Sequence, residues 1–219
     1  MSDRAIRWAG LAGVLFVVMI LATVFATGSM PKPDDNIDKI RSFFVDHRGA
    51  LLFSEFFGLL ATPFAFWFAV VMREIVGRDQ TARAMGTASL LGLAITAPMP
   101  MVGGGLEAAA VYVKGATAGY GDQVLRFVFV AQGFMFMATS CGIIVFAAGA
   151  GLAIRRSGVL PAYTMWLAAL AVVGNILTVF TALGPGMSAL GLFGVLTFAL
   201  FILVTGITMA AGKATAPAM

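Results

Sequence analysis

The chain has 219 residues, of which 60% are hydrophobic and only 11% are charged. A soluble globular protein carries about a quarter charged residues, so this composition excludes a water-soluble fold. Basic residues outnumber acidic residues by four, but they form no run of five or more, which argues against a nucleic-acid-binding protein. The single cysteine, Cys141, excludes a disulfide within the chain and a cysteine zinc cluster.

The apolar residues are concentrated in six stretches, each long enough to cross a bilayer as an α-helix. We predict spans near residues 7–27, 50–72, 84–112, 124–154, 160–182 and 187–211. The stretches lack alternation with period two, which argues against a membrane β-barrel. The sequence therefore predicts an all-α fold, a six-span polytopic transmembrane helical bundle in which residues 1–219 form a single integral membrane domain.

The distribution of basic residues predicts the orientation of the bundle, because cytoplasmic loops are enriched in Lys and Arg. With the N-terminus in the cytoplasm, the inner side carries eight basic and three acidic residues, and the outer side six basic and seven acidic residues. Both termini are therefore predicted to be cytoplasmic. The first span has an apolar core of about 19 residues, longer than that of a signal peptide, and we expect it to be retained.

Residues 34–47, after the first span, are predicted to form a short extracytoplasmic amphipathic helix. Ile37, Ile40, Phe43 and Phe44 share one face of this helix. We expect Asp34 or Asp35 to cap its start and Gly49 to end it in the left-handed conformation. Such a helix lies in the membrane interface or folds over the end of the bundle.

Four polar side chains are predicted to lie inside four different spans, about 8–12 Å from the outer boundary. These are Glu55, Glu107, Gln132 and Asn175. Three of them lie on stripes of mostly small residues at helical spacing, a pattern that lets membrane helices approach closely. Glu55 is followed in the second span by Gly58, Thr62, Ala65 and Ala69. The other two stripes belong to the third and fifth spans. They are Gly86, Ser89, Leu93, Thr96, Pro100, Gly103 and Glu107 in the third span, and Thr164, Ala168, Ala171, Asn175, Thr178 and Ala182 in the fifth.

Two interpretations of these four side chains remain open. In the first, they line one outward-facing polar pocket, whose mouth includes His47, Arg48 and Tyr112. Carboxyl groups inside a membrane are candidates for functional sites. In the second, the amides only join helices, and Glu55 pairs with Arg48 near the interface. The run APMPMVGGG at 97–105 predicts a kink or a break in the third span, below Glu107.

Most catalytic chemistry is disfavoured, because the chain has one histidine, His47, and no GxSxG or GxxxxGK[ST] motif. A membrane enzyme that uses His47, Asp46 and Glu55 remains as a minor alternative, although no nucleophile is evident. We expect no metal and no cofactor. Paired methionines in the third and fourth spans are expected to pack in the core.

The stretch FFVDHRGALL, which leads from the extracytoplasmic helix into the second span, resembles a segment of small bacterial multi-pass membrane proteins of unknown function. The resemblance covers mainly residues 37–74 and implies a location in a bacterial cytoplasmic membrane. We expect an integral membrane protein whose pocket binds a small molecule, an ion or a lipid head group, in transport or sensing. The alternative is a structural or accessory subunit, with other membrane proteins or a second copy as partners.

Overall fold

A computed structural model describes residues 1–183 and 188–214, and these residues form helices and loops without a β-strand. The helices are α1 (Asp3–Thr27), α2 (Ile37–Asp46), α3 (Arg48–Val76), α4 (Gln80–Thr96), α5 (Pro98–Tyr112), α6 (Ala116–Gly119), α7 (Asp122–Ser157), α8 (Ala162–Val179), a 3-10 helix η1 (Phe180–Leu183) and α9 (Ser188–Ala210). The predicted all-α fold is confirmed for this part of the chain.

Six helical segments of the described chain are long and apolar enough to cross a membrane, as predicted. The segment Gln80–Tyr112 contains both α4 and α5 and forms one span. The chain leaves regular helix only at Ala97, which keeps helical angles of φ −63° and ψ −42°. This interruption precedes Glu107 by ten residues, so it does not lie beside that carboxyl group. Residue 187, where the last span was predicted to begin, lies outside the described residues.

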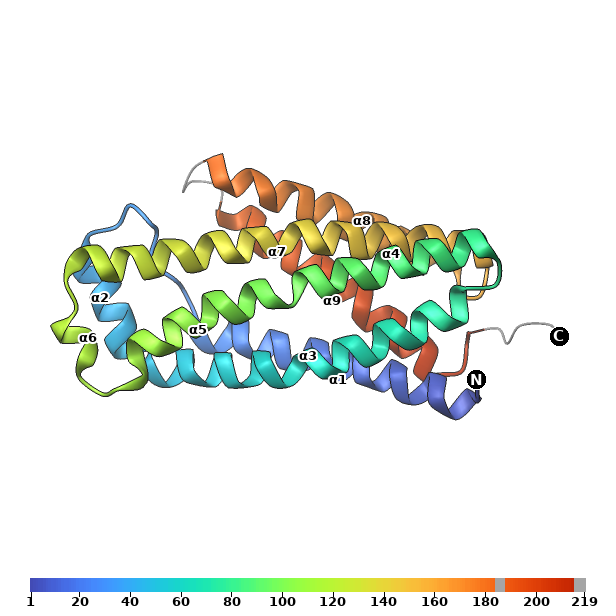
Figure 1. The fold of residues 1–219 in the computed structure, drawn as a ribbon, viewed down its shortest axis with the longest axis horizontal. Coiled ribbons are helices and arrows are strands. Elements are labelled where there is room, and N and C mark those ends of the chain that lie inside the picture. The colour runs from blue at the N-terminus through green and yellow to red at the C-terminus, as the bar shows by residue number, and fades with distance from the viewer. Residues whose placement is uncertain (184–187, 215–219) are drawn as a thin grey trace.

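Consecutive spans run in opposite directions along the long axis of the bundle (Figure 1). The helices α2 and α6 lie at one end. The start of α1 and the end of α9 lie at the opposite end, and Arg7 is adjacent to Gly212 there. The connections from α3 to α4 and from α7 to α8 also lie at this end, which we call the terminal end.

Helix α2 folds against the end of the bundle. Its residues Ile40, Phe43 and Phe44 are buried against a second apolar core built by the start of α3, the end of α5 and the start of α7. The apolar face of the helix was therefore predicted correctly, but the residues predicted to cap its start and its end were both wrong. Asn36, and not Asp34 or Asp35, accepts the capping bond, from the Asp38 amide at 3.2 Å.

The end of α2 is shared with the start of α3. His47 is both the C-cap residue of α2 and the N-cap residue of α3, with φ −100° and ψ 14°. Gly49 lies within the first turn of α3 and not in the left-handed conformation. The predicted glycine stop is wrong because the chain turns at His47, two residues earlier, and continues directly into the second span.

Glycines set the contact between α4 and α7, where the two backbones touch. A Cβ atom at Gly92 would lie 2.8 Å from the Gly142 carbonyl oxygen, and one at Gly142 would lie 2.7 Å from the Gly92 carbonyl oxygen. Two helical turns along α7 from Gly142, Gly149 faces the Ser89 backbone. Lipid tails are as apolar as the side chains, so membrane helices associate largely through van der Waals contact, and small residues permit it.

The small-residue stripes predicted from the sequence do face other helices. In the third span, Gly86, Ser89, Leu93, Thr96, Gly103 and Glu107 are buried, and only Pro100 is exposed. In the fifth span, Thr164, Ala168, Ala171, Asn175 and Thr178 are buried, while the side chain of Ala182 lies outside the described residues.

The Gly92–Gly142 contact gives a test of the packing. We expect Gly142→Ala to lower the free energy of unfolding by about 1–3 kcal/mol, because the added methyl group forces α4 away from α7. Gly133→Ala, in the same helix, is the matched control, since no atom lies within 4 Å of a Cβ at that position. Thermal unfolding in detergent measures both variants. Equal midpoints for the two would contradict the packing argument.

At the terminal end, Asp79 joins two connections. Its carboxylate accepts a bond from the Ala82 amide at 2.8 Å, which caps α4, and another from Arg156 Nε at 2.9 Å. The Ala82 amide and then Arg156 hold the pKa of the Asp79 carboxyl below its ordinary value. The link fixes the α3–α4 connection against the end of α7.

The lowered pKa of Asp79 predicts a pH dependence of stability. An Asp whose pKa is lowered in the folded state stabilises that state above its ordinary pKa, and this contribution is lost as the pH falls through the folded value. Asp79→Asn keeps a capping side chain but loses the ion pair, so we expect wild type to unfold at a higher temperature than the variant at pH 7. The difference should begin to shrink as the pH falls to about 4, the ordinary pKa of Asp, and should be lost at lower pH once the folded-state carboxyl takes up a proton. A difference that does not shrink at all as the pH falls below 4 would contradict the ion-pair argument.

Candidate functional site

Two carboxyl groups inside the spans lie close together. Glu55 of α3 points at the backbone of α5, because a Cβ atom added to Gly104 would overlap Glu55 Oε2. Glu107 lies three residues after Gly104, which is one turn further along the same face of α5. Glu55 Oε2 therefore contacts α5 within one helical turn of Glu107. The structure thus brings two of the predicted residues together on neighbouring helices.

The Glu107 side chain is buried and lacks a complete set of partners. The residue is 7% exposed. Its Oε1 atom accepts no hydrogen bond from any residue that the structure describes. Leaving a buried polar atom unpaired costs roughly 1–3 kcal/mol, and more for a charged group. A buried oxygen that keeps this cost is a candidate for a ligand contact.

Neither carboxyl group has a basic partner in the described part of the chain. The four ion pairs found there involve Asp35, Glu74, Asp79 and Asp122. In particular, the expected pairing of Glu55 with Arg48 does not form. The pair therefore brings two potential negative charges together without a compensating positive charge from the described residues.

Gln132 of α7 lies on the other side of α5. A Cβ at Gly103 would be 3.5 Å from the Cα and carbonyl oxygen of Gln132. Gly103 and Glu107 are four residues apart and share a face of α5. The Gln132 side chain is half-buried and forms no hydrogen bond with another described residue. It is thus the nearest of the two predicted amides to the carboxyl pair.

Asn175 lies elsewhere in the bundle. Its Nδ2 atom donates to the Ala171 carbonyl at 2.9 Å and to the Gly194 carbonyl of α9 at 3.2 Å. Thr178, one turn along, donates to the Leu190 carbonyl of α9 at 3.1 Å. These bonds join α8 to α9, so the structure does not bring Asn175 to the carboxyl pair.

Arg48 holds the start of α3 against the end of α5. Its Nε donates to the Val111 carbonyl at 2.8 Å and its Nη2 to the Tyr112 carbonyl at 2.7 Å. These carbonyls belong to the last turn of α5, where a helix lacks internal donors and carries partial negative charge. Because Glu55 and Glu107 lie on these same helices, the Arg48 bonds fix the segment that carries the pair.

His47 and Tyr112 lie at this end without touching the carboxyl groups in any observed contact. The His47 ring stacks on Phe43 with a centroid distance of 4.7 Å, and its Nδ1 lies 3.2 Å from the Phe43 carbonyl oxygen. The Tyr112 side chain is 71% exposed. What Tyr112 contributes is its carbonyl group, which accepts the Arg48 bond.

Two further arginines, which the sequence did not single out, bind carbonyl groups at the same end. Arg41 of α2 donates to Thr117 and Tyr120 carbonyls at 2.7 and 3.0 Å and pairs with Asp122. Arg126 of α7 donates to the Pro33 and Asp35 carbonyls at 2.6 and 3.0 Å. Such bonds carry no sequence signal, because any backbone carbonyl can accept them.

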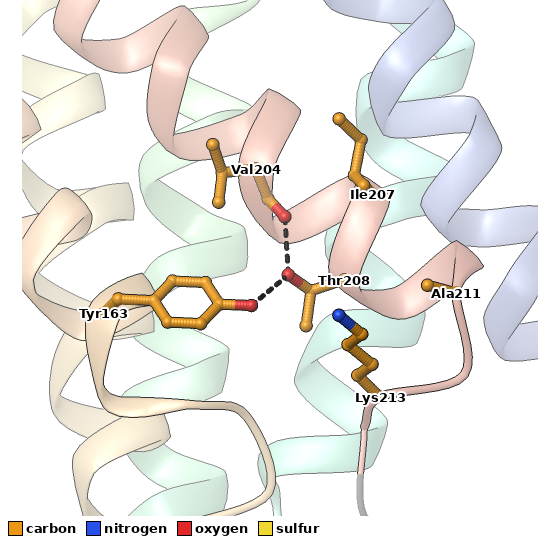
Figure 2. Close-up of a pocket in the computed structure, with 6 residues that line it drawn as sticks. All are labelled: Tyr163, Val204, Ile207, Thr208, Ala211 and Lys213. Carbon is orange, nitrogen blue, oxygen red and sulfur yellow. Dashed lines mark hydrogen bonds between the residues drawn. The ribbon is translucent and has the colours of Figure 1, made fainter.

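The shape and composition of the described residues limit the chemistry. They contain no group of three or more His, Cys, Asp and Glu side chains that is placed to hold a metal ion. A narrow apolar gap, too small to hold a water molecule, lies among Phe68, Phe146 and Phe198 in the main core. A second hollow opens at the terminal end between α8 and α9 (Figure 2). Neither is lined by Glu55 or Glu107.

No protein-family model, curated protein or solved structure matches the chain. What the fold defines is therefore the class alone, an all-helical protein with six helices suited to crossing a membrane.

The Arg48 bonds give a test of how the site is held. We expect Arg48→Ala to lower the free energy of unfolding by about 2 kcal/mol, because hydrogen bonds from a charged donor are lost at the end of α5. Arg83→Ala removes an exposed side chain that forms no hydrogen bond or ion pair with another described residue, so it should leave stability nearly unchanged. Thermal unfolding followed by tryptophan fluorescence compares them. Equal effects would show that Arg48 does not fasten α3 to α5.

Proposed function

We propose that this chain is a multi-pass membrane protein that binds a positive charge, a proton or a small cation, between Glu55 and Glu107, in transport or sensing. The observation that carries the proposal is the unpartnered Oε1 atom of buried Glu107, next to a second carboxyl group. Gln132, on the neighbouring stretch of α7, is placed to orient such a ligand.

The physical argument is the cost of two like charges in a medium of low dielectric constant. Coulomb repulsion at a few ångströms is several times larger there than in water. Two carboxyl groups at short distance avoid this repulsion by sharing a proton or by binding a cation between them. The absence of a basic partner among the described residues leaves the compensating charge to a ligand.

The same charge argument narrows the ligand classes expected from the sequence. An anionic lipid head group or an anionic small molecule is disfavoured at a carboxyl pair, because like charges repel. Of the ligand classes expected from the sequence, a small cation and a proton therefore remain. Asn175, which is engaged between α8 and α9, is left out of the binding group.

We further propose that α2 faces the outside of a bacterial cytoplasmic membrane and acts as a lid over the carboxyl pair. The terminal end carries eight of the basic residues and three of the acidic residues, which supports a cytoplasmic location for that end. The packing of α2 over the ends of α3, α5 and α7 supports its role as a lid.

The test uses the purified protein in detergent and follows its protonated carboxyl groups by infrared spectroscopy between pH 5 and 9. Na⁺, K⁺, Mg²⁺ and Ca²⁺ are added in turn at constant ionic strength. If the pair binds a proton, we expect an infrared signal from a protonated carboxyl group at neutral pH that is lost in Glu107→Gln. If the pair binds a cation, we expect one of the added cations to remove this signal and to release a proton. Glu55→Gln should weaken either response at least tenfold, because the pair is then broken.

Glu74→Gln is the matched control, because Glu74 lies at the far end of α3, the helix that carries Glu55, and is exposed beside Arg73. It should leave the carboxyl signal and the proton release unchanged. The proposal is wrong if Glu55→Gln and Glu107→Gln both behave as wild type in the two measurements.

A further inference from the structure

The terminal end carries a second feature that is separate from the carboxyl pair. A hollow of about 250 Å³ opens between α8 and α9 (Figure 2). It is lined by Tyr163, Val204, Ile207, Thr208, Ala211 and Lys213. Tyr163 belongs to the first turn of α8 and Thr208 to the last turn of α9. The hollow therefore lies where two spans end, at the level expected for lipid head groups.

The hydroxyl groups in this hollow are already bonded to each other. Thr208 Oγ1 donates to the Val204 carbonyl at 2.7 Å, so its proton is committed. The Tyr163 hydroxyl, at 2.9 Å from Thr208 Oγ1, is then the donor of that bond. The donor left at the hollow is the Lys213 ammonium group, whose side chain turns back along the end of α9 (Figure 2).

The position of Lys213 follows from the way α9 ends. Gly212 has a positive φ of 70°. Its amide bonds the Met209 carbonyl, and the Lys213 amide bonds the Thr208 carbonyl, each at 3.1 Å. This pair of bonds is the Schellman motif, which fixes the residue after the glycine against the last turn of the helix.

A second cation, Arg7, lies beside Gly212, the residue that precedes Lys213. A Cβ atom at Gly212 would be 3.1 Å from Arg7 Nη2. Arg7 is held there because α1 and α9 cross closely at Gly10 and Gly206. Neither Arg7 nor Lys213 takes part in the four ion pairs of the described residues. Two basic residues thus lie near the end of α9, and neither has an anionic partner from that part of the chain.

The walls next to these cations suit a hydrocarbon chain. Ile207 of α9 is 52% exposed, and Trp166, one turn from Tyr163 on α8, is 68% exposed. Tyr and Trp are enriched where a span meets the head groups of the bilayer. An apolar surface therefore rises from the two cations toward the middle of the span, with aromatic residues at the level of the boundary.

From this arrangement we propose that the hollow binds an anionic glycerophospholipid. The phosphate group contacts Lys213 and Arg7, and an acyl chain lies along Val204 and Ile207. Charge complementarity selects the anionic head group, and the apolar wall selects a lipid over a free anion. Anionic lipids attract basic residues near a membrane surface by about 1 kcal/mol per residue.

The test places the protein in phosphatidylcholine nanodiscs that contain increasing amounts of phosphatidylglycerol with brominated acyl chains. Trp166 is the reporter after Trp8→Phe and Trp67→Phe, because bromine quenches the fluorescence of a tryptophan that it touches. We expect saturable quenching by the anionic lipid. Lys213→Gln and Arg7→Gln should each raise the half-saturating fraction about fivefold.

Two further variants make the result specific. Lys114→Gln, an exposed lysine at the opposite end, should leave the quenching curve unchanged. Ala211→Phe, which adds no tryptophan, should fill the hollow and abolish saturation while both cations remain. Brominated phosphatidylcholine should quench without saturating.

Three results would overturn the proposal. The first is that Lys213→Gln and the variant with the filled hollow give the same quenching curve as the reporter protein. The two cations would then only complement the negative end of α9. Brominated phosphatidylcholine would saturate equally well, which would exclude charge selection. Inorganic phosphate at millimolar concentration would displace the lipid, which would indicate a site for a free anion.

Discussion

The close approach of helices at glycine residues is the constraint on which the rest of this structure depends. In a bilayer, helix association gains little from the hydrophobic effect, so it rests on van der Waals contact and a few hydrogen bonds. The third span meets α7 at Gly92 and Gly103 and meets Glu55 of α3 at Gly104. Without Cβ atoms at these positions, this span lies between its two neighbours and brings Glu107 beside Glu55.

The two ends of the bundle are fastened by different means. At the α2 end, arginines donate to backbone carbonyls from distant parts of the chain, as Arg48 does to Val111 and Tyr112. At the terminal end, an ion pair between Asp79 and Arg156 joins two connections, while Arg7 and Lys213 remain outside the ion pairs of the described residues.

The polar residues within the spans divide in the same way. Asn175 and Thr178 donate hydrogen bonds to carbonyl groups of α9 and so join α8 to α9. Glu55 and Glu107 have no partner that accounts for their charge among the described residues. Polar groups in lipid are costly, and this cost is the reason that we propose a ligand at the two carboxyl groups.

The sequence by itself determined the six spans, the buried stripes and the apolar face of α2, because length, hydropathy and helical spacing are local properties of the chain. It did not determine which polar side chains meet, since a stripe of small residues fits more than one neighbour. Only the tertiary structure placed Asn175 against α9 and Glu55 against Gly104. It also decided that Arg48 bonds carbonyls and not Glu55, because a backbone acceptor has no signature in the sequence.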